Sequence, residues 1–463
     1  MMLPSKLSML ALLTWPLLAG AQTSPELAPV LERLDRLERA NSKLSEEVQA
    51  LRAELAAVRG NQGASGGAAV EAKAAPEAAV AGQPTVAERL DIAEQRIEEQ
   101  AQTKVESSQK FPVRFTGIAL FNAFANSRQS GGTADYPTVA AAQPGAARSG
   151  AGVRQTILGL EFRGPNTLWG GDVHGSVYMD FFDGSTTLDQ FMRLRTASLE
   201  IDWKDRSVLA GIEKPIFNPR EPNSLAQMGV SPLTSTGNLW LWVPQVRVEQ
   251  DFSFAAATGL RARLGVVQTN EIGPYAGSEP GGSVERARPG LEGRFEFYHN
   301  FDDERRLEFA PGFHVSTTHI GGMSIPSQVF SLDWFFNPWQ RVEFSGAFFT
   351  GQNVALLGSA VKQGFGIENG LAEAVHSRGG WGQFTIHAAK RLDFHLFTGQ
   401  QDDDNGELVP GSIGKNLLWG GNLYYHLAPN VVLGLETTQV RTVRIAQGTR
   451  LNNHYDLALG YFF

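Results

Sequence analysis

The last twelve residues of the chain, NNHYDLALGYFF, alternate between apolar side chains and polar or small ones. A period of two predicts a β-strand. The apolar positions are Tyr455, Leu457, Leu459, Tyr461 and Phe463. A strand with such a row of side chains at the edge of an open sheet would be prone to aggregation. We therefore expect this strand to pair on both sides, within a closed sheet.

Composition excludes several other classes of protein. No apolar run after the N-terminus of this 463-residue chain approaches the roughly 20 residues that a transmembrane helix requires. The formal net charge of -8 argues against a nucleic-acid partner, which would favour a basic surface. The chain has no cysteine, which rules out a disulfide framework, a catalytic thiolate and a zinc–cysteine site.

The N-terminus has the pattern of a secretory signal peptide. Lys6 precedes an apolar run over residues 7–18, and the small residues Ala19, Gly20 and Ala21 follow. This order of charged, apolar and small residues predicts export and cleavage after Ala21. We therefore assign residues 1–21 to the signal peptide.

Residues 22–60 have the heptad pattern of a coiled coil. One apolar series, broken by a single polar residue, contains Leu27, Leu34, Asn41, Val48 and Leu55, and a second series, offset by three, contains Val30, Leu37, Leu44, Leu51 and Val58. Asn41 is the polar residue, which would fix the register at a cost in stability. The alternative is a single amphipathic helix that packs on a domain. The residues expected to mediate oligomerisation are Leu34, Leu37, Asn41, Leu44, Val48, Leu51 and Leu55.

Two short segments connect this helix to the rest of the chain. Residues 61–84 are rich in Ala, Gly and Pro and have no periodicity, which is typical of a flexible linker. Thr85 and Glu88 have the spacing of a capping box. They predict a short helix within residues 85–110.

From residue 111 to residue 463 the pattern changes to two-fold alternation, as in GRFEFYHNF and SQVFSLDWFF. Seven short polar connections begin near residues 165, 204, 255, 302, 337, 389 and 428. Each interval between them is expected to hold two strands of about ten residues and a longer loop. Short turns at one end and long loops at the other are typical of outer-membrane β-barrels. We therefore predict a 16-stranded antiparallel transmembrane barrel, so that the fold class is all-β with an N-terminal coiled coil.

Several of these segments together resemble the trimeric DcaP-like porins, a family of porins with an N-terminal coiled coil. The resemblance covers the signal peptide, the coiled coil, FPVRFTGIALFNAFANS, FMRLRTASLEIDW and NNHYDLALGYFF. It implies a passive channel for small hydrophilic solutes, often anionic ones, in a homotrimer surrounded by outer-membrane lipid. The C-terminus also resembles the signal that the barrel-assembly machinery recognises, here Tyr461 and Phe463. The chain departs from the family in having no dense lysine run in a predicted pore loop.

The strand parity opposite to the apolar face predicts which side chains line the pore. It places Arg247, Arg261, Arg263 and Arg294 inside, with Glu249 and Asp251 among them. These charges either attract anions or form a self-neutralising ladder that hydrates the wall. Residues 218–242 are the loop expected to fold inward, because its apolar NLWLWV segment would pack on a wall rather than stand in water.

Two other functions remain open at this stage. One is an envelope tether, in which the coiled coil binds a periplasmic partner and the barrel is an anchor. The other is an outer-membrane hydrolase, although the chain has no H-E-x-x-H motif or P-loop. Solvated pore lining is the expected role of the inward-facing histidines, which are His174, His314, His387, His395 and His426. No cofactor or metal site is expected, and the acidic QQDDDNGE segment is expected to be a solvated loop.

Overall fold

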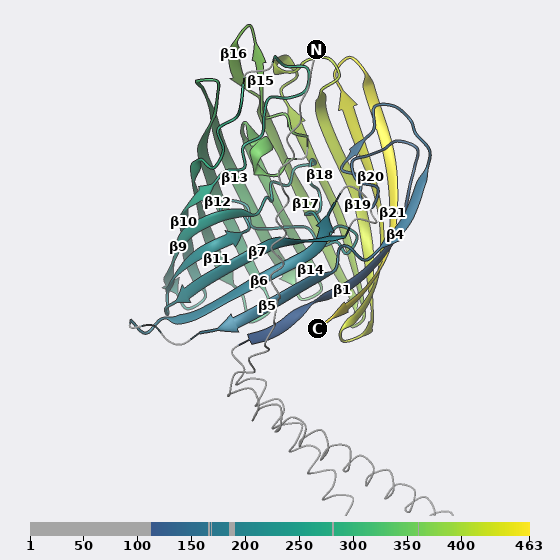
Figure 1. Ribbon diagram of the computed structural model, residues 1–463. Coiled ribbons are helices and arrows are strands. Elements are labelled where there is room, and N and C mark those ends of the chain that lie inside the picture. Colours follow the sequence, from purple (N-terminus) through teal and green to yellow (C-terminus); the bar gives the residue numbers. More distant parts are fainter. Residues whose placement is uncertain (1–112, 165–166, 168, 185–189, 280–281, 360) are drawn as a thin grey trace, which may run out of the picture. The chain divides into compact units, whose positions relative to one another are not determined.

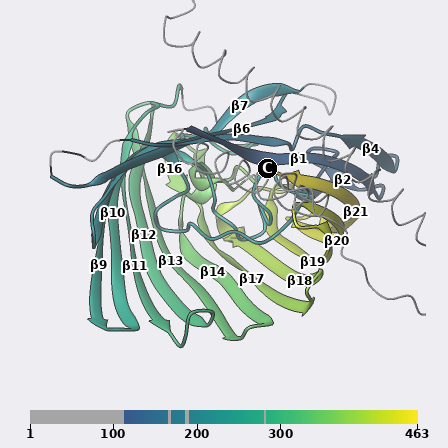
Figure 2. The same ribbon diagram turned by 90° about the horizontal axis from the view of Figure 1, so that it is seen from below.

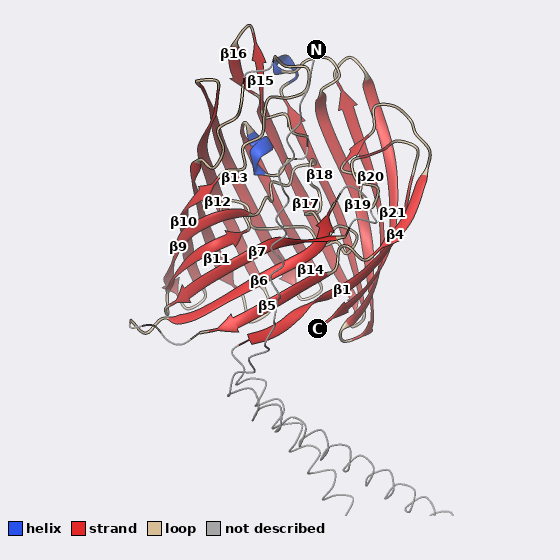
Figure 3. Ribbon diagram, viewed as in Figure 1, coloured by secondary structure: helices blue, strands red, loops and turns tan. Residues whose placement is uncertain are grey.

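The computed structural model describes residues 113–164, 167, 169–184, 190–279, 282–359 and 361–463. The predicted signal peptide, coiled coil, linker and short helix therefore lie outside the described residues, and so do all seven predicted oligomerisation residues. Among the described residues, no helix is long and apolar enough to cross a membrane. Figure 3 shows strands joined by loops, with two short 3-10 helices among the described residues.

The described strands form a closed antiparallel barrel of 16 strands (Figure 1). Two short segments, β4 and β5, both pair with β1 and act as one strand interrupted at residues 153–156. The barrel strands are β1 (Val113–Asn126), β4 (Arg148–Gly152), β5 (Ile157–Arg163), β6 (Asp172–Asp183), β7 (Phe191–Asp202), β8 (Arg206–Glu213), β9 (Val243–Ala255), β10 (Thr258–Gln268), β11 (Pro289–Asn300), β12 (Arg306–Ile320), β13 (Met323–Trp339), β14 (Val342–Gln352), β17 (His376–Ala389), β18 (Leu392–Asp403), β19 (Ile413–Ala428), β20 (Val431–Arg444) and β21 (Gly448–Phe462).

Smaller elements lie in the connections. Two-residue strands β2 (Ser130–Gly131) and β3 (Val139–Ala140) pair with each other between β1 and β4. The hairpin of β15 (Phe365–Glu368) and β16 (Leu371–Ala374) lies between β14 and β17. The 3-10 helices are η1 (Val354–Leu357) and η2 (Asn405–Glu407).

Alternation along each strand separates an apolar outer face from a polar lumen face. The outer face exposes large apolar side chains, among them Val246, Val248, Phe252, Val266, Leu291, Phe297, Phe330, Phe348, Leu435 and Leu457. Successive side chains of a strand point to opposite faces, so the residues between them point into the lumen. This pattern explains why the chain can place Arg, Glu and Asp inside without interrupting the apolar surface.

The C-terminal strand closes the barrel, as the sequence predicts. β21 pairs with β20 on one side and with β1 on the other, from Ile118 opposite Phe462 to Asn126 opposite His454. Phe463 follows the strand and continues the seam, because its carbonyl accepts hydrogen bonds from the Gly117 amide at 3.0 Å and the Thr116 hydroxyl at 3.0 Å. Its ring stacks on Phe115, with 5.1 Å between ring centroids.

Strands are connected at all seven predicted turn positions, and six of these connections are two to five residues long. The rule of one longer loop in each interval is wrong in two places. β12 and β13 are joined by Gly321 and Gly322 alone. Both glycines have positive φ, 57° and 82°, which a two-residue hairpin turn requires. β20 and β21 are joined by residues 445–447 only. In both intervals the chain extends the strands beyond the expected ten residues, to as many as 17 in β13, and little chain remains for a loop.

Candidate pore lining and constriction

The connection from β8 to β9, residues 214–242, folds into the barrel; we call it loop L3. Figure 2 views the ring of strands from below, with chain crossing its interior. L3 begins at the wall, where the Ile216 amide donates to Glu292 of β11 at 2.7 Å and the Ser331 hydroxyl of β13 donates to the Phe217 carbonyl at 2.8 Å. Residues 218–242, expected from the sequence to fold inward, therefore lie in the lumen.

The middle of L3 is held by amide side chains of the opposite wall. Asn122 of β1 donates to the Leu225 carbonyl at 2.9 Å, and Asn422 of β19 donates to the Asn223 carbonyl at 2.8 Å. Gln155, in the interruption between β4 and β5, accepts from the amides of Met228 and Gly229 and donates to the Ala226 carbonyl at 2.8 Å. The loop thus contacts strands on both sides of the lumen. A loop that satisfies its backbone groups on the wall in this way is held in a defined position.

Apolar side chains of L3 pack on the lumen face as well. Leu233 lies in a buried cluster with Trp381, Phe397 and Leu418, and Leu239 lies in another with Phe217 and Phe349. The apolar side chains of L3 therefore pack on the barrel wall, as the sequence predicted.

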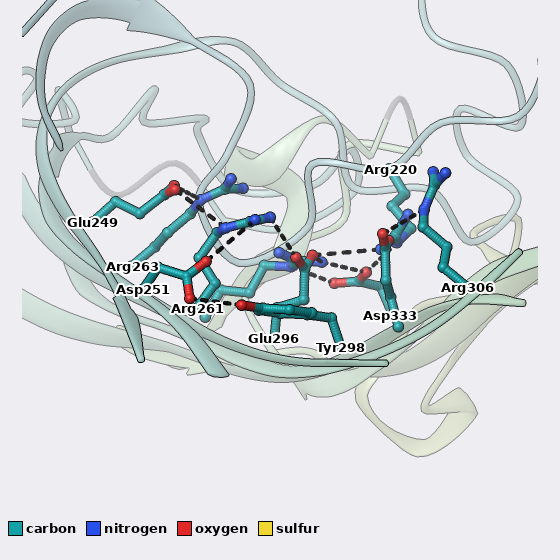
Figure 4. Close-up of polar contacts among 11 residues, drawn as sticks. Arg220, Glu249, Asp251, Arg261, Arg263, Glu296, Tyr298, Arg306 and Asp333 are labelled. Atoms are coloured by element: carbon teal, nitrogen blue, oxygen red, sulfur yellow. Dashed lines mark hydrogen bonds and ion pairs between the residues drawn. The ribbon is translucent and has the colours of Figure 1, made fainter. Parts of the chain in front are cut away.

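A ladder of alternating charges runs along the lumen face of β9 to β13 (Figure 4). Arg263 pairs with Glu249, and Arg261 pairs with Glu249 at 3.3 Å, Asp251 at 3.4 Å and Glu296 at 2.8 Å. Because these are direct neighbours on adjacent strands, most of the ladder is neutralised locally.

The centre of the ladder is a buried ion-pair network that the sequence did not predict. Arg294 donates from Nε to Asp333 at 2.7 Å and pairs with Glu296 at 2.6 Å. Arg220 reaches in from L3 and pairs with Asp333 and Glu308. Arg294 and Asp333 are 1 % and 0 % exposed at their side chains. Arg294 therefore contributes to the structure of the wall under L3 instead of offering a free charge to a solute.

Arg247 differs from the other predicted arginines. No ion pair joins it to a carboxylate among the described residues, and its Nε has no hydrogen-bond partner there. Its neighbour on β10 is Gly265, which has no side chain to compete for the space. Arg247 is therefore the predicted pore-lining arginine whose charge is least compensated.

A second basic group faces L3 from β7. Arg193 and Arg195 both bind the one buried carboxylate of Asp180, at 2.8 Å and 2.7 Å. The Arg195 guanidinium also lies over the Trp242 ring of L3, 4.3 Å from its centroid. Two guanidinium groups on one carboxylate leave a net positive charge at this side of the loop. The sequence alternates apolar and basic residues at Met192, Arg193, Leu194 and Arg195. The parity rule could therefore have placed Arg193 and Arg195 in the lumen.

The expectation of solvated histidines is wrong at two positions. His314 is 0 % exposed at its side chain, where Nδ1 lies 2.9 Å from Glu292 and Nε2 lies 2.8 Å from the Ser316 hydroxyl. His395 is also buried. The base of L3 covers His314, and its ring lies 6.0 Å from that of Phe217. The acidic QQDDDNGE segment is a solvated connection only from Asp404 to Gly406, because its first four residues complete β18 and Gln401 and Asp403 are buried.

Replacing Asp333 by Asn should destabilise the barrel, because the change leaves the buried guanidinium of Arg294 and the partly buried one of Arg220 without their shared carboxylate. We expect the free energy of unfolding in urea to fall by about 3 kcal/mol. Glu285→Gln is the matched control, since Glu285 forms an exposed pair with Arg288 and such pairs contribute little. Equal unfolding midpoints for wild type and Asp333→Asn would contradict a structural role for the network.

Comparison with known proteins agrees with this architecture. No protein-family model matches the chain, and no curated protein sequence matches it. Among solved structures, the outer membrane channel DcaP of Acinetobacter baumannii superposes with a TM-score of 0.65 at 16 % identity, over 76 % of this chain and 97 % of that chain. The chain has the porin fold. The fold-level resemblance to the DcaP-like porins is thereby confirmed.

A second solved structure extends the same fold. The anion-selective porin from Comamonas acidovorans superposes with a TM-score of 0.52 at 11 % identity, over 76 % of this chain and 99 % of that chain. At such low identities the likeness describes the path of the chain and not the chemistry of its lumen. The roles of individual lumen residues must therefore be argued from their own contacts.

Proposed function

We propose that the chain is an outer-membrane porin, a passive diffusion channel for small hydrophilic solutes. The observation that carries the proposal is a closed barrel with an apolar outer face and a charged lumen. An inward-folded loop narrows this lumen, and no plug domain fills it among the described residues. A closed barrel pairs every strand, which lipid requires of a spanning sheet. Its wet interior tolerates charge. Reconstitution in a planar bilayer tests the proposal directly.

The setting of the barrel follows from the rest of the chain. A signal peptide at residues 1–21 would export it, and the barrel-assembly machinery would recognise a C-terminus containing Tyr461 and Phe463. Both ends of the barrel lie on the short-turn side, which is the periplasmic side in outer-membrane barrels. The coiled coil at residues 22–60 would then extend into the periplasm.

We propose further that the pore prefers anions. Support comes from the uncompensated Arg247 and from the pair Arg193 and Arg195 on one carboxylate, whereas the ladder itself is largely balanced. The fold-related Comamonas acidovorans protein is an anion-selective porin. Charge on a pore wall sets which ions enter.

Replacing Arg247 by Gln should shift the reversal potential toward cations in a salt gradient. Arg263→Gln should add to the shift, because it removes a positive charge and leaves Glu249 with Arg261 as its partner. Arg294 is left unchanged because its ion pair with Asp333 is part of the wall. Arg441→Gln is the matched control, since it removes the same charge from an exposed position on the outer face. If neither Arg247→Gln nor Arg441→Gln changes the reversal potential, the lumen arginines do not select anions. Their role would then be to keep the pore wall hydrated.

A homotrimer is the proposed assembly, with one helix of the coiled coil from each barrel. The heptads support association, while the number three comes from the resemblance, because leucine-rich heptads with one Asn also suit a dimer. The mass of the full-length protein in detergent should be that of three chains. A dominant monomer or dimer would contradict the proposal, and a trimer that survives deletion of residues 22–60 would show that the barrels suffice.

The alternatives have weaker support. An envelope tether would keep the coiled coil but needs no polar lumen. A hydrolase needs an accessible nucleophile, and among the described residues Ser316, His314 and Glu292 are hydrogen-bonded in series. There the Ser316 hydroxyl is buried, and Glu292 already accepts the Ile216 amide. This arrangement fits an anchor for the base of L3 better than a catalytic site.

A further inference from the structure

Three oxygen-bearing side chains lie side by side on the lumen face where the middle of L3 meets the wall. Asn422 of β19 is directly opposite Glu436 of β20, and Glu436 is directly opposite Asp456 of β21. Glu436 and Asp456 are 7 % and 5 % exposed. Two carboxyl groups thus occupy adjacent buried positions, where like charges destabilise a sheet.

Each of the three side chains has one polar end bound and one acceptor oxygen unused. Glu436 Oε2 accepts from the Ser224 hydroxyl at 2.6 Å and from Asn422 Nδ2 at 3.1 Å. Asp456 Oδ1 accepts from Asn122 Nδ2 at 3.0 Å. The oxygens without a hydrogen-bond partner are Glu436 Oε1, Asp456 Oδ2 and Asn422 Oδ1. The group has more acceptors than donors, and buried acceptors need a partner.

Charge is unbalanced in the same place. Among the described residues, no lysine or arginine forms an ion pair with Glu436 or Asp456, whereas the carboxylates of the ladder are paired with arginines. A buried carboxylate without a cation is costly. The surplus of acceptor oxygens and the missing positive charge are independent observations, and one bound cation would resolve both.

We propose that Glu436, Asp456 and Asn422 form a binding site for a hard divalent cation of the Ca²⁺ type. All three unused ligands are oxygens, which Ca²⁺ prefers, and its flexible coordination suits ligands on three adjacent strands. The two carboxylates match its charge. Asn122 and Asn422 donate to the carbonyls of Leu225 and Asn223 in L3, and Ser224 of L3 donates to Glu436. The cation therefore connects the middle of the loop to β19, β20 and β21.

Terbium luminescence tests the site, because Tb³⁺ replaces Ca²⁺ at oxygen sites and emits when a nearby tyrosine is excited. Tyr424 is on the same face of β19, two residues from Asn422, and packs against the cluster that contains Leu225. Full-length protein in detergent, stripped with a chelator, should give tyrosine-sensitised emission that Ca²⁺ competes away. The double variant Glu436→Gln with Asp456→Asn should lose this emission.

A matched control removes two carboxylates elsewhere on the lumen face. Glu200 and Asp202 lie with His174 in a partly exposed group whose possible ligand atoms are within 4.8 Å of one another. Glu200→Gln with Asp202→Asn should keep the Ca²⁺-competed emission. Emission that survives Glu436→Gln with Asp456→Asn, or that disappears only in the control, would overturn the proposal.

Thermal unfolding gives a second readout that needs no variant. Ca²⁺ should raise the unfolding temperature of the chelator-treated wild type, since a ligand that binds only the folded state stabilises it. If Glu436 and Asp456 instead share a proton, Ca²⁺ will leave the unfolding temperature unchanged and no sensitised emission will appear. That pair of results rejects the cation site.

Discussion

Removing the middle of L3 should raise the single-channel conductance by roughly two-fold or more, because conductance depends on the free cross-section of the lumen. The deletion can be made without straining the barrel. Asn218 Nδ2 donates to the Leu239 carbonyl at 2.8 Å, so the two ends of the loop already lie close together. We would delete residues 221–237 and join Arg220 to Asn238 through two glycines, which keeps Arg220 in its network with Asp333.

The matched control shortens another connection at its exposed tip. Residues 368–371 form the tip of the β15–β16 hairpin, and their removal should leave the conductance as in wild type. Both deletions must give folded barrels, which heat-dependent mobility on gels reports. A folded L3 deletion with unchanged conductance would mean that the constriction lies elsewhere.

Replacing Phe463 by Ser should remove most of the assembled protein from the outer membrane. The substitution abolishes the stacking of its ring on Phe115 and on Tyr461, with centroids 5.1 Å and 6.2 Å apart. It also changes the aromatic terminus through which we expect the assembly machinery to recognise the chain. The amount of heat-modifiable protein in membrane fractions measures the effect.

Tyr455→Ser is the control for Phe463→Ser, because Tyr455 is an exposed aromatic of β21 with the same parity as Phe463 but is not at the terminus. It should assemble at near wild-type levels. Refolding of purified Phe463→Ser into detergent separates stability from recognition, because the assembly machinery is absent there. A defect that remains in detergent comes from the lost seam contacts. Full assembly of Phe463→Ser in cells would show that the terminus carries no signal.

Strand parity made the barrel predictable from the sequence. The side-chain period of a strand is two, so the apolar row from Tyr455 to Tyr461 fixes the outer face, and the same rule places Arg247, Arg261 and Arg263 on the lumen side. The closure of β21 on β1 follows from the same row. Turn positions were predictable because polar turn residues interrupt the alternation.

Contacts between distant segments were not predictable by parity. Parity places Arg294 inside, but it cannot show that Arg294 is locked between Asp333 and Glu296, because Asp333 is on β13 and only the folded barrel brings it to Arg294 on β11. Arg220 and Ser224 belong to L3, and their partners Asp333 and Glu436 are more than 100 residues away. The prediction of a longer loop failed between β12 and β13 because two glycines were enough to turn the chain.

Single-channel recording of the purified full-length protein in a planar bilayer tests the proposed function most directly. A porin with this lumen should give discrete, steady conductance steps that are ohmic at low voltage, with a reversal potential on the anion side in a salt gradient. An envelope anchor or an enzyme with a closed lumen would give no steady conductance from correctly folded protein, and that result would contradict the channel.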